Sequence, residues 1–305
     1  MKILITGGAG YIGTELTYEL TAHSENDEIV IYDNLSRGNY NLFIGRNKLR
    51  SNVTFIHGDL LDTRKLEQAL KGVDVVYHLA AKVTTPFADQ DPNLFEQINH
   101  WGTAELVYAV EESDVKKFIY VSSASVYGSS SEEVSHNTPP NPVTFYGISK
   151  MRGEEHVNRL FDSSIDTYII RCGNVFGYSK SMRFDSVINR FVFQANFKNR
   201  ITIDGDGEQR RSFIHIDKTA DILAKVSAGM LRQGTYDLVE DALSINYIAD
   251  TFKEIFPGLE FLYVNQRLKL RQLIVKADPA INSLTRIEFR TLKQVLTVFK
   301  NEFTF

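Results

Sequence analysis

Short apolar runs rich in β-branched residues recur through the first half of the chain. They lie at residues 3–6, 29–32, 53–57, 74–79, 118–122 and 167–171. Uninterrupted apolar runs of this length are typical of parallel strands that are covered on both faces. Segments of helical character lie between them, at residues 11–21, 61–70, 92–112 and 144–161. The alternation predicts an α/β fold built on a doubly wound parallel sheet.

The rhythm changes after Asn174, and aromatic and basic residues become frequent between residues 184 and 200. We therefore expect a first domain over residues 1–173 and a smaller α/β lobe over residues 174–305. Part of residues 206–230 is expected to return to the core of the first domain.

Composition narrows the possible partners and location. A formal net charge of −4 over 305 residues gives no basic face of the kind that nucleic acids require. The single cysteine, Cys172, excludes an intramolecular disulfide and a multi-cysteine metal site, and we expect no metal. No apolar run reaches the roughly 18–20 residues that cross a bilayer. The apolar run at the N-terminus is also too short for a signal peptide. We expect a cytoplasmic protein without nucleic-acid or membrane partners.

A glycine-rich turn follows the first predicted strand and opens the first predicted helix. Gly7, Gly10 and Gly13 would permit a tight turn, a close backbone approach to a pyrophosphate and close helix packing. Asp33 ends the second predicted strand, about 20 residues further on, where an acid accepts hydrogen bonds from ribose hydroxyls. Since it would repel a 2′-phosphate, Asp33 favours NAD over NADP, although the nearby Arg37 leaves NADP open.

Tyr146 and Lys150 are four residues apart in a predicted helix and therefore share a face. A lysine ammonium and a nicotinamide cation nearby would favour the phenolate and lower the tyrosine pKa from about 10. Tyr146 could then act as a general base. Taken alone, the pair is as consistent with a packing tyrosine beside a solvated lysine. Ser123, at the end of the fifth predicted strand, favours the chemical reading because ligands bind at that edge of such sheets.

Several motifs resemble those of the short-chain dehydrogenase/reductase family. They are the Gly-x-x-Gly-x-x-Gly turn, Gly58-Asp59-Leu60, His78-Leu79-Ala80-Ala81 and Tyr146-x-x-x-Lys150. Three further stretches, at residues 33–38, 171–177 and 205–217, resemble the extended, NAD-dependent epimerase/dehydratase branch, which includes UDP-glucose (UDP-galactose) 4-epimerases. The resemblance is good over residues 1 to about 220 and poor beyond. It implies a Rossmann domain holding NAD, with a catalytic triad of Ser123, Tyr146 and Lys150.

The same resemblance implies specific contacts. Those to NAD would come from Gly7, Gly10, Tyr11, Ile12, Gly13, Asp33, Asn34, Asp59, Leu60, Leu79, Ala80, Ala81, Asn99, Ser122, Tyr146 and Lys150. Those to the substrate would come from Lys82, Ser123, Ser125, Asn174, Arg211 and Arg271. Arginine suits a phosphate because its planar fork donates two hydrogen bonds in parallel.

The resemblance implies epimerisation of a UDP- or dTDP-linked sugar at C4, through hydride abstraction, a 4-keto intermediate and hydride return. Related 4,6-dehydratases carry an acidic pair where this chain has Ala124 and Ser125, which disfavours dehydration. A nucleotide-sugar 4-ketoreductase or dehydratase using NAD(P) is the alternative, and a non-catalytic, regulatory NAD-binding protein is a second. Relatives pair the helices corresponding to residues 92–112 and 144–161, so a homodimer is expected.

Overall fold

The computed structural model describes residues 1–45, 49, 52–83, 91–264, 272–288 and 291–303. Its centre is a seven-stranded parallel sheet in the order β11-β7-β5-β4-β1-β2-β3. The strands are β1 (Lys2–Thr6), β2 (Glu28–Asp33), β3 (Val53–His57), β4 (Val75–His78), β5 (Lys117–Ser123), β7 (Asp166–Cys172) and β11 (Gly234–Leu238). The predicted doubly wound α/β fold is confirmed.

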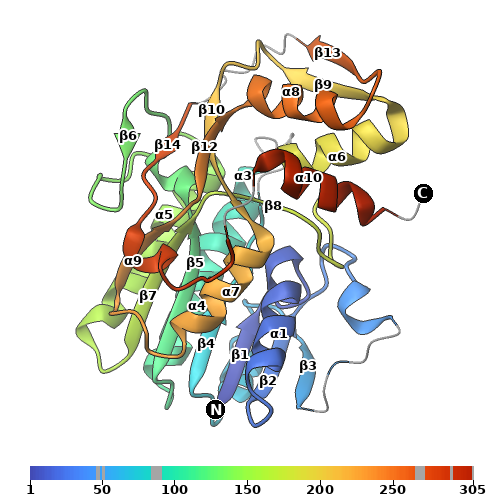
Figure 1. Cartoon of the computed structure of the whole chain (residues 1–305). Helices are drawn as coiled ribbons and strands as arrows, with labels where there is room; N and C mark the ends of the chain where they lie inside the picture. Colours follow the sequence, from blue (N-terminus) through green and yellow to red (C-terminus); the bar gives the residue numbers. More distant parts are fainter. Residues whose placement is uncertain (46–48, 50–51, 84–90, 265–271, 289–290, 304–305) are drawn as a thin grey trace.

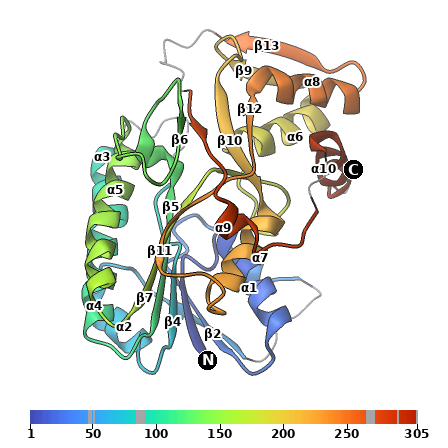
Figure 2. The ribbon, with the colours of Figure 1, turned by 60° about the vertical axis from the view of Figure 1, so that its left-hand side comes forward.

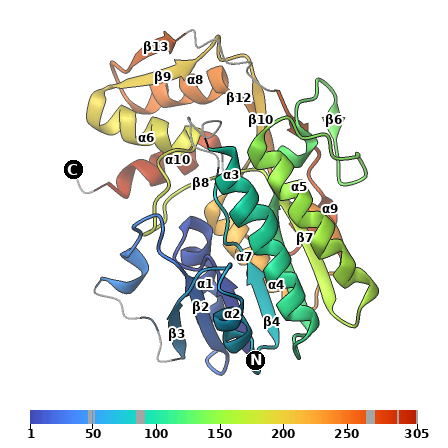
Figure 3. The same ribbon diagram turned by 180° about the vertical axis from the view of Figure 1, so that it is seen from behind.

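Helices cover both faces of this sheet. On one face lie α1 (Tyr11–His23) and α7 (Ile216–Val226), which pack against each other (Figure 1). The other face carries α2 (Thr63–Ala69), α4 (Gly102–Glu111) and α5 (Phe145–Val157) (Figure 3). Successive side chains of a strand point to opposite faces, so Ile3 and Ile5 enter the core beneath α1 and α7, while Leu4 enters the other core.

Two local expectations need correction. Residues 53–57 were expected to be buried on both faces, but β3 is the last strand of the sheet and Phe55 is 38% exposed. An edge strand pairs on one side only, so its apolar residues lose part of their cover. Residues 92–112 form three consecutive pieces instead of one regular helix: α3 (Pro92–Phe95), the π-helical stretch η3 (Glu96–Trp101) and α4.

A smaller lobe lies above one end of the sheet (Figure 2). Its core contains Phe191, Phe252 and Phe299. Its elements are β8 (Asn174–Phe176), α6 (Val187–Lys198), β9 (Arg200–Asp204), β10 (Arg210–His215), β12 (Asp241–Ser244), α8 (Ile245–Ile255), β13 (Glu260–Val264) and α10 (Leu292–Asn301). The chain leaves this lobe to form α7 and β11 on the main sheet. The division at residue 173 remains a prediction.

Short elements complete the chain. They are η1 (Asn41–Phe43), η4 (Ala124–Tyr127), β6 (Glu133–Val134), η5 (Asn158–Asp162), β14 (Ile274–Val275) and α9 (Pro279–Asn282). Among the described residues, no helix has both the length and the apolar character that crossing a membrane requires.

Candidate active site

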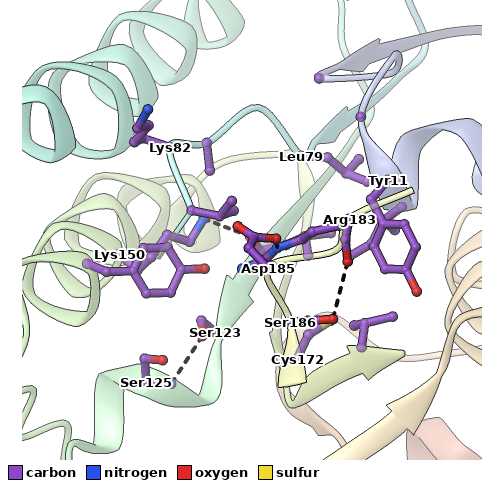
Figure 4. Close-up of a pocket in the computed structure, with 18 of the residues that line it drawn as sticks. Tyr11, Leu79, Lys82, Ser123, Ser125, Lys150, Cys172, Arg183, Asp185 and Ser186 are labelled. Carbon is purple, nitrogen blue, oxygen red and sulfur yellow. Dashed lines mark hydrogen bonds and ion pairs between the residues drawn. The ribbon is translucent and has the colours of Figure 1, made fainter. Parts of the chain in front are cut away.

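A cavity of about 900 Å³ opens between the carboxyl ends of the central strands and the lobe. Its walls come from the turn after β1, the ends of β2, β4 and β5, the start of α5, and the lobe elements β8, α6 and β10. Figure 4 shows Ser123 and Lys150 on one side and Arg183 and Asp185 on the other. The volume is at the upper end of ligand pockets, so the cavity has room for a large ligand.

The glycine turn leaves no room for side chains. Gly7 has φ +73°, and a Cβ atom there would lie 2.6 Å from the backbone nitrogen of Ala80. A Cβ atom on Gly13 would lie 2.5 Å from the carbonyl oxygen of Gly7. The turn therefore brings bare backbone and the N-terminus of α1 to the cavity, a combination that favours phosphate groups.

Asp33 stands at the end of β2 as predicted. Its Oδ2 accepts a hydrogen bond from the backbone nitrogen of Ala9 at 3.0 Å, and its Oδ1 accepts one from that of Leu35 at 2.8 Å. Burial raises the pKa of its carboxyl, and the two backbone hydrogen bonds oppose that rise. The nearby Arg37 lies 3.7 Å from Asp185 Oδ2 of the lobe. Asp33 is thus held at the end of β2, where contact with ribose hydroxyls remains a prediction, while Arg37 faces another carboxylate.

The other predicted cofactor residues fall into two groups. Asn34 Nδ2 donates to Asp59 Oδ2 at 2.7 Å, and both residues line the cavity. Further predicted cofactor residues in the lining are Tyr11, Ile12, Leu60, Leu79, Ala80 and Ala81, and the predicted substrate residue Lys82 lies beside them. Asn99, in contrast, is fully buried. Its Oδ1 accepts a hydrogen bond from the backbone nitrogen of Lys82 at 2.7 Å, and its Nδ2 donates one to the carbonyl oxygen of Lys82 at 2.9 Å. Asn99 therefore holds the Lys82 backbone in place from within the fold, and its direct contact with the cofactor remains a prediction.

The predicted triad comes together at the carboxyl end of β5. The Thr144 hydroxyl caps α5 by accepting from the backbone nitrogen of Gly147 at 2.9 Å, which starts the helix just before Tyr146. The Ser123 hydroxyl accepts a hydrogen bond from the backbone nitrogen of Ser125 at 3.1 Å, and both Ser123 and Tyr146 line the cavity. Lys150 Nζ donates to the carbonyl oxygen of Val121 at 2.8 Å and lies 4.0 Å from the centre of the Tyr120 ring.

The pKa values of this triad correct one expectation. Burial raises the pKa of Tyr146, and the positive charge of Arg183 and the hydrogen bond from Ser123 oppose that rise. Burial lowers the pKa of Lys150 to about 7, against the opposing field of Glu154. The protein groups alone therefore do not give Tyr146 the lowered pKa we expected, because the cost of burying a phenolate outweighs their attraction. The charge of a bound nicotinamide is the remaining contribution.

Behind the triad lies a network that sequence reasoning missed. Arg171 forms a bidentate ion pair with Glu154, in which Nη2 lies 2.6 Å from Oε2. Through Nη1 it also donates a hydrogen bond to the hydroxyl of Tyr127 at 2.9 Å. Tyr127 donates to Asp237 Oδ1 at 2.7 Å. Ser122, predicted to touch the cofactor, donates its hydroxyl to Glu154 Oε1 at 2.5 Å. The four partners come from α5, β7, η4 and β11, so no sequence spacing pointed to them.

The lobe supplies the predicted substrate residues Asn174 and Arg211, which both line the cavity together with Ser125. Asn174 Nδ2 donates to the carbonyl oxygen of Ser212 at 3.0 Å. Arg271, the other predicted phosphate contact, lies outside the described residues.

Further lobe residues line the cavity without having been predicted, among them two arginine–aspartate pairs and a glutamine. Arg183 Nε donates to Asp185 Oδ1 at 2.7 Å, and Arg190 Nη2 pairs with Asp204 Oδ2 at 3.1 Å. Arg183 and Arg190 lie between the recognised motifs, and the sequence indicated only that basic residues are frequent in this region. Gln209 Nε2 donates to the carbonyl oxygen of Asp204 at 3.1 Å, one position before the predicted hairpin arginines.

Together these features define a class of protein. A glycine turn at a helix start, an acid at the end of β2 and a Ser-Tyr-Lys group at the end of β5 form the site of a dinucleotide-dependent Rossmann enzyme. The model of the NAD dependent epimerase/dehydratase family matches residues 3–237. This chain belongs to that family, so it is an enzyme and its cofactor is NAD.

Individual relatives agree with this assignment. A putative UDP-glucose 4-epimerase of Methanocaldococcus jannaschii is 32% identical over 226 residues, which cover 72% of this chain and 70% of the relative. A dTDP-D-glucose 4,6-dehydratase of Dictyostelium discoideum is 32% identical over an alignment that covers 71% of this chain and 53% of the dehydratase. The UDP-glucuronic acid 4-epimerase of Bacillus cereus, solved with UDP-glucuronic acid and NAD, is 26% identical with a TM-score of 0.85, covering 99% of this chain and 98% of that one.

Proposed function

We propose that this protein is an NAD-dependent nucleotide-sugar epimerase acting at C4 of the sugar. The observation that carries the proposal is the convergence of Ser123, Tyr146 and Lys150 in the cavity that also presents Asp33 and the glycine turn. NAD bound there supplies the acceptance and return of a hydride at the sugar carbon. The similar proteins named as UDP-sugar 4-epimerases support the choice of reaction.

Each triad member then has a separate task. Tyr146 takes the proton of the 4-hydroxyl through its phenolic oxygen and returns a proton to that oxygen once the configuration at C4 has changed. Ser123, which lines the cavity together with Tyr146, donates to the same sugar oxygen and holds it in place. Lys150 contributes positive charge beside the phenolate when it is protonated.

The residues after Ser123 argue against dehydration. Eliminating water needs a group that can protonate the leaving hydroxyl, and the chain offers Ala124 and Ser125 there. Asp185 reaches the cavity from the lobe, but its carboxylate is held by Arg183 at 2.7 Å.

We propose that the lobe binds the nucleotide of a UDP- or dTDP-linked sugar. Arg211, Asn174 and Lys82 are the candidates for its pyrophosphate, since all three line the cavity and can donate hydrogen bonds to phosphate oxygens. Arg271 remains a predicted fourth contact. Ser125 is the candidate for a sugar hydroxyl.

The test is to incubate the purified protein with UDP-, dTDP-, CDP- and GDP-sugars without added cofactor. Chromatography and NMR should show two sugars that differ only at C4, reached from either side, without net NADH formation. Tyr146→Phe serves as the inactive control. A product lighter by one water would identify a dehydratase, and turnover only with added NADPH would identify a ketoreductase.

We also propose a cytoplasmic homodimer. Trp101 at the end of η3 and Tyr108 in α4, about two helical turns apart, are 52% and 39% exposed, as side chains at a subunit interface would be in an isolated chain. Light scattering should give twice the chain mass of 34.7 kDa, and a monomer at micromolar concentration would refute the dimer.

A further inference from the structure

Three consecutive residues at the end of β5 bear on the triad. The carbonyl oxygen of Val121 accepts the hydrogen bond from Lys150 Nζ at 2.8 Å. Ser123, two residues further on, lines the cavity with Tyr146 and is one of the groups that lower the pKa of that phenol. The position of this strand end therefore sets where both α5 side chains lie relative to Ser123.

Ser122, between them, points to the opposite side of the strand because side chains alternate. Its hydroxyl is 2.5 Å from Glu154 Oε1. Glu154 is only 3% exposed and lies four residues after Lys150 on α5, hence on the same face of the helix. The strand end is thus tied to α5 at two points one turn apart, by Lys150 and by Glu154.

Arg171 holds the Glu154 carboxylate in place. Its Nε lies 3.0 Å from Oε1 and its Nη2 lies 2.6 Å from Oε2, which is the bidentate geometry of a strong charge-assisted pair. A buried carboxylate is stable only with such partners. The hydroxyl of Tyr127 occupies Nη1 of the same guanidinium, so Arg171 is itself fixed.

Glu154 also acts on the charge of Lys150. The titratable groups near Lys150 come from four elements: His78 of β4, Tyr120 of β5, Glu154 of α5 and Cys172 of β7. Tyr146 lies one turn before Lys150 on α5. Burial lowers the pKa of Lys150 to about 7, and Glu154 is the strongest group that opposes this fall. Only a protonated Lys150 attracts a phenolate, so the charge state of the site depends on Glu154.

We propose that Glu154 is a positioning residue for the epimerase: it fixes the end of β5 against α5 through Ser122 and places a carboxylate one helix turn from Lys150. It touches neither substrate nor cofactor and acts through Ser122 and Lys150. This inference rests on the proposed function for its kinetic test, but the charge of Lys150 can be measured without turnover.

Glu154→Gln keeps the shape of the side chain and removes its charge. The pKa of Lys150 should fall further. When the pH is raised, Lys150 should therefore lose its proton at a lower pH than in the unmodified enzyme. The alkaline limb of the kcat profile should move down by about one unit, and activity above pH 7 should drop about tenfold. A variant whose profile and kcat match the unmodified enzyme would overturn the proposal.

Two variants separate position from charge. Glu154→Asp keeps the charge but is one methylene too short to hold both Ser122 and Arg171, and Ser122→Ala removes only the link to the strand. Both should retain the pH profile and lower kcat by roughly threefold to tenfold, the effect of one lost hydrogen bond. They also decide the question if Glu154→Gln does not fold, because full kcat in both would contradict the anchoring role.

Glu240→Gln is the matched control. Glu240 pairs with Lys218 at 2.6 Å, and the two side chains are 12% and 5% exposed. The Glu240→Gln variant therefore loses a buried ion pair comparable to that of Glu154 with Arg171, but remote from the triad. It should be destabilised to a similar degree without a shift of the pH profile, and a shift equal to that of Glu154→Gln would count against a specific role.

NMR of labelled lysine, with Lys150→Met identifying the signal, gives the pKa of Lys150 in the NAD-bound protein. A lower pKa in Glu154→Gln supports the charge role even if no sugar is epimerised, whereas an unchanged pKa refutes it. The failure of the proposed function would appear separately, as the absence of product from the unmodified enzyme.

Discussion

The groups next to the triad, on the sheet side of the cavity, and the groups on the lobe side differ in how their buried polar atoms are paired. On the sheet side, both oxygens of Glu154 have partners in Arg171 and Ser122, and Lys150 Nζ is bonded to Val121. On the lobe side, Gln209 Oε1 and Arg190 Nε are buried and have no hydrogen-bond partner among the described residues. Gln209 and Arg190 are each bonded on their other polar atoms to Asp204. Further behind the triad, Asp237 Oδ2 is also buried without a hydrogen-bond partner among the described residues.

The difference reflects what each side has to do. Reacting groups gain most when neighbours fix them before the substrate arrives, since no free energy is then spent on orienting them. Unpaired buried polar atoms are rare in folded proteins, and in a ligand pocket they indicate positions that a ligand or water completes. The sheet side is therefore organised for chemistry, and the lobe side is organised for recognition.

Tyr146→Phe tests the chemical side and should have the largest effect. Loss of the phenolic oxygen removes the general base, so kcat should fall by at least about 10²-fold while NAD and nucleotide-sugar binding persist. Ser123→Ala should cost less, because it removes one hydrogen bond to the sugar oxygen. Steady-state kinetics and calorimetry check both. Retention of more than roughly a tenth of the activity in Tyr146→Phe would mean that another group is the base.

Asp33→Asn tests the cofactor end of the same side and should have an intermediate effect. Removing the charge weakens the hydrogen bonds to the ribose hydroxyls and relieves the repulsion of a 2′-phosphate. We expect NAD affinity to fall by about tenfold, with NADP affinity unchanged or higher. Calorimetry with both dinucleotides measures this, and a preference for NADP in the unmodified protein would contradict the assigned role of Asp33.

Gln209→Met tests the lobe side and should have the smallest effect. The substitution keeps the volume and removes the unpaired acceptor, so the KM for the nucleotide sugar should rise about threefold to tenfold with kcat unchanged. NAD affinity is the internal control. If kcat fell instead and KM did not change, the two sides would not divide recognition from chemistry in the way proposed.

The sequence predicted the chemical side well because its groups lie within motifs. Gly7, Asp33, Ser123 and Tyr146 each follow or precede a recognisable strand or helix, and parallel strands bring their carboxyl ends to one edge. Glu154 lies on the predicted helix, yet its importance was invisible. Its partner Arg171 is 17 residues away on another element, and the sequence does not say which side chains meet across a core.

The sequence by itself determined the α/β fold, the family and the order of the cofactor and triad residues, because these depend on local periodicity and on short motifs with fixed backbone requirements. Only the tertiary structure decided that β3 is an exposed edge, that Asn99 supports Lys82 from within the fold, and that burial sets the pKa values of Tyr146 and Lys150. These properties arise from contacts between elements distant in the chain and from the loss of water around them, which no spacing of residues encodes.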